Sequence, residues 1–253
     1  MAITLNFDKK VVFITGGSSG IGRACVKLFA EAGARVAFSY GSNDAAAKGV
    51  IDELKNFSVY GTKIELTSEK DVVEKTGEIR KLFGSIDILV NNAGIWKRGD
   101  IDTMSIDEWK ETIDINLTGT FLITREVSKY MKLQNSGRII NIASTAGQRG
   151  EPHYSHYAAS KGALISMTKS LAVELAPSNI TVNCVAPGWV ATRMTDHIFN
   201  DPVQKEKIEK AIPRGKIASA EDIAGPVLFL ASQLADHITG EILNVNGGSV
   251  LCG

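Results

Sequence analysis

The chain has 253 residues, of which 44% are hydrophobic, and its 28 basic and 28 acidic side chains give a formal net charge of zero. This length suits one domain, residues 1–253, with a large buried core. A balanced charge argues against nucleic-acid and anionic-membrane partners, which attract proteins with a strong positive field. No apolar run approaches the roughly 20 residues that cross a bilayer, and the first residues lack the apolar stretch of a signal peptide. We therefore expect a cytoplasmic protein.

The cysteines and histidines do not follow the spacing of a metal site or a disulfide framework. Cys25, Cys184 and Cys252 form no C-x-x-C pair. His153 and His156 stand at i and i+3, but no carboxylate or cysteine motif completes a metal shell around them. We expect reduced thiols and no bound metal.

Strand-like apolar runs alternate with helical patterns along the chain. The strands are predicted at 11–15, 35–40, 59–65, 86–90, 138–144, 180–185 and 241–245, and the helices at 20–32, 43–56, 69–83, 105–132, 154–176 and 219–233. Such alternation predicts right-handed βαβ crossovers and therefore an α/β fold, with a parallel sheet that helices cover on both faces.

The segment 191–215 interrupts this alternation. It joins a strand to a helix, contains Pro202 and Pro213, and is longer than a normal connection in such a fold. Long segments of this kind are usually functional, so we interpret it as a substrate lid. The alternative is a surface excursion without a role at the site.

Tyr157 and Lys161 share one helical face in YAASK, residues 157–161. The ammonium group is expected to stabilise the phenolate and to lower the pKa of Tyr157. Ser144 ends the predicted strand 138–144, and ligands of parallel sheets bind beyond the carboxyl ends of the strands. The three side chains together predict a site of proton transfer.

A glycine-rich turn follows the first predicted strand. Gly16, Gly20 and Gly22 in GGSSGIG, residues 16–22, permit a tight turn and a close approach of backbone amides to a pyrophosphate. The turn therefore predicts a dinucleotide site, with an ordinary loop as the alternative.

These motifs stand in a fixed order with NNAG at 91–94, Asn116 in INLTG, and VAPGWVAT at 185–192. In that order the chain resembles the short-chain dehydrogenase/reductase family. The resemblance implies a single Rossmann-type, doubly wound sheet of about seven strands. It also implies an NAD(P)(H)-dependent oxidoreductase that interconverts a ketone and a secondary alcohol by hydride transfer.

The resemblance also implies roles for individual residues. Tyr157 would exchange a proton with the carbonyl oxygen, Ser144 would orient that oxygen, and Lys161 would lower the pKa of Tyr157 and hold the nicotinamide ribose. Asn116 would hold a water that relays protons, with a solvent-facing helix residue as the alternative. The implied cofactor contacts are Gly16, Ser18, Ser19, Gly20, Ile21, Gly22, Tyr40, Ser42, Asn43, Glu65, Leu66, Asn92, Ala93, Gly94, Tyr157, Lys161, Pro187, Gly188, Val190 and Thr192.

The end of the second predicted strand bears on the choice between NADP and NAD. Tyr40 stands where members that require NAD usually carry an acidic residue, and Ser42 and Asn43 can hydrogen-bond a phosphate. Ser19 and Gly41 supply no positive charge where NADP-specific members often have one. We predict that NADP(H) is preferred and that NAD(H) is also used.

The substrate is predicted from the similarity of residues 138–247 to the 3-oxoacyl-acyl-carrier-protein reductase branch of the family. A 3-oxoacyl thioester is therefore expected, either bound to a carrier or not. Residues 176–179, where that branch often has basic residues, carry no charge, while Lys129, Lys132 and Arg138 remain available to an acidic carrier. Sugar, polyol and hydroxysteroid dehydrogenases share the motifs and stay as alternatives, as does a non-catalytic dinucleotide-binding protein.

Two further patterns concern the surroundings of the site. Helix 154–176 is apolar nearly all round, and with the family resemblance this predicts a homotetramer or homodimer. Trp96, Tyr154 and Trp189 lie beside the predicted site loops, where they either wall the substrate or pack in the core.

Overall fold

Seven parallel strands form one sheet in the computed structural model, which describes residues 5–252. The strands are β1 (Val11–Ile14), β2 (Arg35–Tyr40), β3 (Val59–Lys63), β4 (Ile88–Asn91), β5 (Gly137–Ile142), β6 (Ile180–Pro187) and β7 (Ile242–Val245). Their order is β3-β2-β1-β4-β5-β6-β7, so the direction of winding reverses between β1 and β4. This confirms the predicted α/β fold with a doubly wound parallel sheet, and it places the topological switch point beside the glycine-rich turn.

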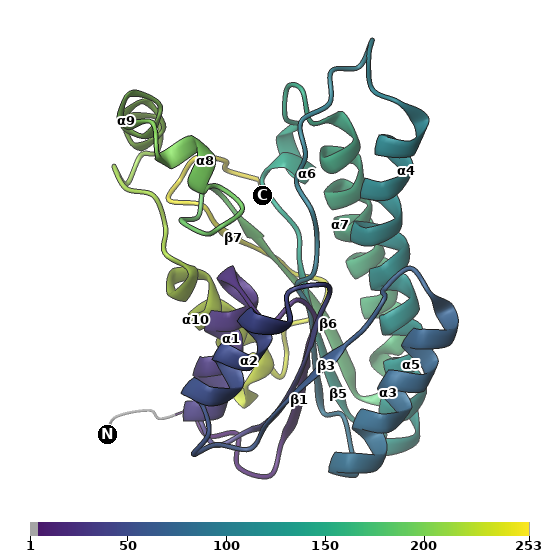
Figure 1. Cartoon of the computed structure of the whole chain (residues 1–253). Helices are drawn as coiled ribbons and strands as arrows, with labels where there is room; N and C mark the ends of the chain where they lie inside the picture. Colours follow the sequence, from purple (N-terminus) through teal and green to yellow (C-terminus); the bar gives the residue numbers. More distant parts are fainter. Residues whose placement is uncertain (1–4, 253) are drawn as a thin grey trace.

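Helices cover both faces of the sheet (Figure 1). They are α1 (Gly20–Glu31), α2 (Asp44–Glu53), α3 (Glu69–Phe83), α4 (Ile106–Ile113), α5 (Gly119–Gln134), α6 (Ala146–Arg149), α7 (Ser155–Leu175), α8 (Asp196–Phe199), α9 (Pro202–Ala211) and α10 (Ala220–Ala231). Helices α1, α2 and α10 lie on one side, and α3, α4, α5 and α7 lie on the other.

The core consists of two apolar clusters, one on each face of the sheet. Ile14 packs in the cluster beneath α1 and α10, whereas its neighbour Phe13 packs in the cluster beneath α3 and α5. This alternation follows from the two-residue period of a strand. Because both faces are buried, the central strand β1 is apolar throughout, with no polar side.

The helix predicted at 105–132 is confirmed, since the chain stays helical from Ile106 to Gln134. Within it a π-helical turn, Asp114–Thr118, joins α4 to α5, and Asn116 lies buried in this turn. Such turns widen the helix locally and are frequent at functional sites. The sequence predicted the helix but not this change of winding.

Helix α7 buries one stripe against its own chain. His156, Ser160, Leu164, Thr168 and Ala172 are buried at a spacing of four residues, whereas Val173 is 78% exposed. The sequence predicted a helix buried on more than one side, and within the described residues only one side is covered.

The segment 191–215 contains the helices α8 and α9 in place of an unstructured loop. Helix α9 begins where the Asp201 carboxylate accepts hydrogen bonds from the backbone N–H groups of Val203 and Gln204, with Pro202 at the first helical position. These are favourable signals for a helix start. The length of the segment is therefore largely taken up by two short helices.

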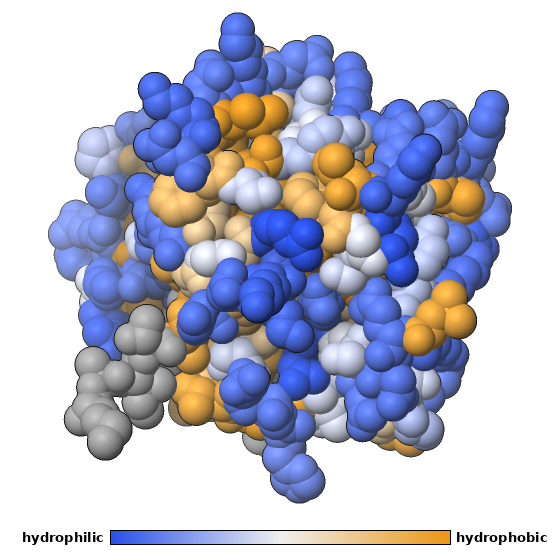
Figure 2. Space-filling view, turned by 90° about the horizontal axis from the view of Figure 1, so that it is seen from below, coloured by the Kyte–Doolittle hydropathy of each residue, from blue (hydrophilic) through white to orange (hydrophobic). Residues whose placement is uncertain are grey.

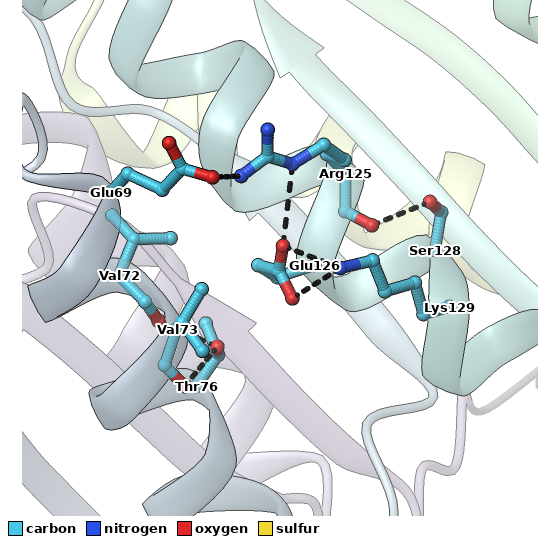
Figure 3. A network of polar contacts seen from close by, with 8 residues as sticks. All are labelled: Glu69, Val72, Val73, Thr76, Arg125, Glu126, Ser128 and Lys129. Atoms are coloured by element: carbon cyan, nitrogen blue, oxygen red, sulfur yellow. Dashed lines mark hydrogen bonds and ion pairs between the residues drawn. The ribbon is translucent and has the colours of Figure 1, made fainter.

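A network of ion pairs joins α3 to α5 (Figure 3). The Arg125 guanidinium lies 2.6 Å from Glu69 and 3.3 Å from Glu126, and the Lys129 ammonium lies 2.7 Å from Glu126. The Glu126 side chain is only 5% exposed, so two cations compensate a carboxylate that has lost most of its water. Lys129 is consequently engaged within its own chain.

Within residues 5–252, no helix is long and apolar enough to span a membrane. Figure 2, seen from below, shows hydrophilic residues around most of this face, with more apolar residues gathered toward its middle.

Candidate functional site

A cavity of about 840 Å³ lies where the carboxyl ends of the strands meet. Most of the residues predicted for catalysis and cofactor binding line it, namely Gly16, Ser18, Ser19, Gly20, Ile21, Tyr40, Ser42, Glu65, Leu66, Asn92, Ala93, Gly94, Ser144, Tyr157, Lys161, Pro187, Gly188, Val190 and Thr192. Gly22, Asn43 and Asn116 are not among the lining residues. The motifs converge because each follows a strand of one parallel sheet.

The glycine-rich turn is shaped to receive a phosphate group. Gly16 and Gly20 have φ angles of 68° and 52°, which favour glycine. A Cβ atom on Gly22 would lie 2.2 Å from the carbonyl oxygen of Gly16, so α1 packs against the turn more closely than any other residue allows. Ser19 makes no side-chain capping bond at the start of α1, and the first turn carries no acidic residue. The amides of this turn therefore fit the pyrophosphate of a dinucleotide.

Asn92 ties the NNAG segment to this turn. Its amide nitrogen donates to the carbonyl oxygens of Thr15 and Gly16 at 3.0 Å and 3.2 Å. The two segments therefore form one side of the cavity as a unit. Gly94 completes that side, and a Cβ atom there would lie 3.1 Å from the Asn116 carboxamide oxygen.

The end of β2 differs in two respects from the arrangement that the sequence predicted. The Asn43 carboxamide oxygen accepts a bond from the backbone N–H of Ala46 at 2.9 Å, so its acceptor caps α2. Lys63, which sequence reasoning missed, lines the cavity from β3 and pairs with Tyr40 across the sheet. Its ammonium lies 3.9 Å from Asp44. Lys63 therefore brings an ammonium group to the cavity wall near the end of β2, with the Asp44 carboxylate beside it.

The phenol and the ammonium group meet as the YAASK spacing predicted. The Lys161 ammonium lies 5.8 Å from the centre of the Tyr157 ring and donates to the Ile142 carbonyl oxygen at 2.7 Å. Burial lowers the pKa of Lys161 to about 8. Ser144 lies just beyond the end of β5, and its hydroxyl oxygen accepts from the backbone N–H of Ala146 at 3.1 Å. Ser144, Tyr157 and Lys161 thus share one wall of the cavity.

The pKa of Tyr157 moves in the opposite direction from the one predicted. Burial raises it to about 12, and the neighbouring Ser144 hydroxyl offsets only part of this effect. Desolvation penalises the phenolate more than the surrounding groups stabilise it. The phenol consequently keeps its proton at neutral pH, which suits a group that donates a proton to a carbonyl oxygen.

Asn116 is fixed by three hydrogen bonds inside the protein. Its carboxamide oxygen accepts from the Ile95 N–H at 2.8 Å, and its nitrogen donates to the Ile95 carbonyl at 3.0 Å and to the Ser160 hydroxyl at 3.1 Å. The Ser160 hydroxyl in turn donates to the Tyr157 carbonyl oxygen at 2.7 Å. Asn116 therefore connects the segment after β4 to the turn of α7 that carries the phenol.

Aromatic side chains also gather at the cavity. Trp96 and Trp189 line it, whereas Tyr154, which is not a lining residue, stacks on Trp96 with ring centroids 4.5 Å apart. Arg149 and Glu151, which form an ion pair of 2.9 Å, also line the cavity and were not predicted from the sequence. No local pattern marks these two residues, because only the fold brings the segment before α7 to the cavity.

Comparisons with known proteins agree with this geometry over nearly the whole chain. Residues 16–249 match a family model described as enoyl-(acyl carrier protein) reductase. The chain is 43% identical over 247 residues to 3-oxoacyl-[acyl-carrier-protein] reductase FabG of Aquifex aeolicus, covering 96% of this chain and 98% of that protein. It is 39% identical over 244 residues to the enzyme of the same name from Escherichia coli, with coverages of 96% and 98%. The crystal structure of gox2181 superposes with a TM-score of 0.93 at 32% identity and covers 97% of each chain.

Proposed function

Because the chain belongs to the short-chain dehydrogenase/reductase family, we propose that it reduces a 3-oxoacyl thioester to the 3-hydroxyacyl thioester with NADP(H). The family membership confirms the predicted class, an NAD(P)-dependent oxidoreductase that acts on ketone or CH–OH groups. One observation carries the finer proposal: the residues suited to this reaction line a single cavity in a chain that is 43% identical to a 3-oxoacyl-[acyl-carrier-protein] reductase.

The dinucleotide, when bound, supplies a hydride at the nicotinamide ring. Tyr157 donates its phenolic proton to the carbonyl oxygen, which becomes the hydroxyl oxygen of the product. Ser144 donates a hydrogen bond to the same oxygen and stabilises the negative charge that develops on it. Lys161, which is charged below pH of about 8, stabilises the phenolate left on Tyr157. Asn116 acts as a positioning residue, since its bonds to Ile95 and Ser160 hold both sides of the cavity.

The preference for NADP(H) is supported by the charges near Tyr40. No carboxylate replaces the tyrosine at the end of β2, and Lys63 lies opposite it in β3. An ammonium group attracts the 2′-phosphate that distinguishes NADP from NAD. The Asp44 carboxylate lies 3.9 Å from the Lys63 ammonium, and the Lys63 side chain is largely exposed to solvent. Both effects weaken the attraction of Lys63 for the 2′-phosphate, so the preference is modest and NAD(H) is also used. Tyr40→Asp is expected to shift the ratio of kcat/KM toward NADH.

The carrier is the less supported part of the substrate. Lys129 and Lys132 lie 2.7 Å from Glu126 and 3.9 Å from Glu174, and Arg138 pairs with Asp236. Each of the three basic residues predicted to remain for an acidic carrier is thus balanced by its own chain. We therefore place recognition chiefly in the 3-oxoacyl group, with the carrier as a second contribution.

The test is the consumption of NADPH by the purified protein with matched 3-oxoacyl substrates. Acetoacetyl groups on coenzyme A and on acyl carrier protein are compared with a sugar, a polyol and a hydroxysteroid in the presence of the oxidised or reduced cofactor. Turnover of the two thioesters supports the proposal. Turnover confined to the sugar, polyol or steroid would refute the proposal. Turnover of the coenzyme A thioester alone would exclude acyl carrier protein as part of the substrate.

We also propose that residues 1–253 form one domain, that 191–215 acts as a lid, and that the protein is a cytoplasmic homotetramer or homodimer. The assembly is supported by the exposed apolar side chains of the neighbouring helices α5 and α7, namely Phe121, Leu133 and Val173, which a second copy would cover. The free thiols of Cys25, Cys184 and Cys252 suit the cytoplasm. Light scattering measures the assembly, and protection of 191–215 from proteolysis by cofactor and substrate measures the lid.

A further inference from the structure

Two indole rings form a corner in the wall of the catalytic cavity. Trp96 lies in the segment after β4, Trp189 lies in the segment after β6, and both line the cavity that also contains Tyr157. Their ring centroids are 5.8 Å apart, and the ring planes meet at 83°. The two rings therefore present aromatic surface in two nearly perpendicular directions.

Each indole also contacts an aromatic ring that is not among the cavity-lining residues, and Trp96 additionally lies 5.8 Å from the His197 ring. Tyr154 stacks on Trp96 at 4.5 Å with an angle of 13° between the planes. Phe199, from α8, packs against Trp189 at 5.9 Å with an angle of 65°. The orientations of both indoles are thereby restricted before a substrate binds, and such preorganisation lowers the entropy that binding costs.

The corner is also fixed through the backbone. The N–H of Gly99 donates to the His153 carbonyl oxygen at 2.8 Å, and Gly99 forms an isolated parallel bridge with Tyr154. These bonds join the segment that carries Trp96 to the segment that carries its stacking partner. Three stretches of chain that are distant in sequence, 96–99, 153–154 and 189–199, thus meet at this one corner, which argues that it is a built surface.

We propose, on the basis of the carbonyl reduction proposed above, that Trp96 and Trp189 are specificity-determining residues that bind a flat aromatic ring near the reacting carbonyl. A planar ring that lies against one indole meets the other at an angle, and both offset-stacked and edge-to-face arrangements are favourable. A saturated ring of the same size buries similar apolar area without this electrostatic contribution. A flexible alkyl chain additionally loses rotational freedom when it binds.

The test compares two 3-oxo esters that differ only in one ring, a benzyl and a cyclohexylmethyl group on the reacting carbonyl. A methylene separates the carbonyl from the ring in both esters, so the phenyl ring is not conjugated with the carbonyl, and the change of the ratio in the variants corrects for the remaining inductive difference. The wild-type enzyme is expected to have the higher kcat/KM for the benzyl ester. Trp96→Leu and Trp189→Leu should each lower the benzyl-to-cyclohexylmethyl ratio by about 2- to 12-fold, which is the contribution of one aromatic pair beyond its area.

The matched control is Trp109→Leu, which removes the third indole. Trp109 lies on α4 and is 36% exposed, outside the cavity lining, so its loss should leave the ratio unchanged. Trp96→Phe, which keeps an aromatic ring, should retain most of the preference. A wild-type ratio near one, or a ratio that both leucine variants leave unchanged, overturns the proposal and leaves the rings with a packing role only.

Binding separates this proposal from the reduction on which it rests. The dissociation constants of the same two esters are measured by calorimetry with the cofactor-loaded protein. If neither ester is reduced but the benzyl ester binds more tightly and loses this advantage in Trp96→Leu, the aromatic site stands and the proposed reduction fails. If both are reduced and bound equally well, the reduction stands and the aromatic site fails.

Discussion

Asn116→Ala tests whether this buried side chain positions the catalytic residues. Asn116 is fully buried, and its carboxamide makes hydrogen bonds of 2.8, 3.0 and 3.1 Å to Ile95 and Ser160. Alanine leaves the Ile95 N–H and C=O groups without these partners, and each unsatisfied buried group costs about 1 to 3 kcal/mol. We therefore expect a loss of roughly 3 kcal/mol of unfolding free energy, which lowers the Tm of a chain of this length by about 6 to 12 °C.

The effect on catalysis distinguishes positioning from stability. The bond from Asn116 to Ser160, and from Ser160 to the Tyr157 carbonyl, fixes the turn of α7 that carries the phenol. A misplacement of about 1 Å at a reacting group can cost about 10²-fold in rate. At a temperature well below both Tm values, kcat of Asn116→Ala should fall by at least about 10-fold.

Asn183→Ala is the matched control for this change. Asn183 is a buried asparagine of β6 that joins two backbone groups, the Ile238 carbonyl at 2.8 Å and the Glu241 N–H at 3.0 Å, away from the cavity lining. Its loss should lower Tm by a similar amount and leave kcat within about twofold, because no catalytic group depends on it. An Asn116→Ala enzyme with the Tm of this control and an unchanged kcat would refute the positioning role.

Three further predictions concern the cofactor and the ammonium group. Gly22→Ala places a Cβ atom 2.2 Å from the Gly16 carbonyl oxygen, and such overpacking costs about 1 to 3 kcal/mol. The variant should therefore have a lower Tm and bind NADPH more weakly in calorimetry. An unchanged affinity would contradict the proposed phosphate site. Lys63→Glu should lower the NADPH-to-NADH ratio of kcat/KM by roughly 2- to 30-fold, and an unchanged ratio would exclude Lys63 from phosphate recognition. Burial lowers the pKa of Lys161 from 10.5 to about 8, so the ammonium group loses its charge as the pH rises through about 8. The kcat for reduction should therefore fall near pH 8. A kcat that stays constant up to pH 10.5 would argue against a catalytic role of the Lys161 charge. The same shift means that Lys161 destabilises the fold below pH 8 and that this penalty fades toward pH 10.5.

Local patterns predicted the parts of the structure that depend on neighbours in sequence. The apolar runs became strands, and Gly16 and Gly20 adopted the positive φ angles of the tight turn. Ser144, Tyr157 and Lys161 met in one cavity because segments that follow parallel strands emerge at the same edge of the sheet. Once the alternation of strands and helices was recognised, topology placed these groups together.

Contacts between distant segments could not be predicted in this way. Lys63 reaches the site only because β3 pairs with β2 in the register that sets it opposite Tyr40. The Asn116 side chain, in the π-helical turn, bonds to Ile95 and Ser160, which lie elsewhere in the chain. Neither relationship leaves a periodic signal in the sequence.

Desolvation is likewise invisible in a sequence. The spacing of Tyr157 and Lys161 indicated an electrostatic stabilisation of the phenolate, but the number of atoms that surround the phenol decides its pKa, and burial raises it to about 12. The basic residues Lys132 and Arg138 similarly looked free for a carrier until the fold brought Glu174 and Asp236 beside them.

The measurement that tests the central claim most directly is the rate of NADPH-dependent reduction of a 3-oxoacyl thioester by the wild-type protein and by Tyr157→Phe. The phenylalanine ring keeps the packing of the cavity wall and removes only the proton donor. If Tyr157 protonates the carbonyl oxygen, kcat falls by about 10² to 10⁴ while the dissociation constant for NADPH stays nearly unchanged. A Tyr157→Phe enzyme that retains most of the wild-type kcat would contradict the account.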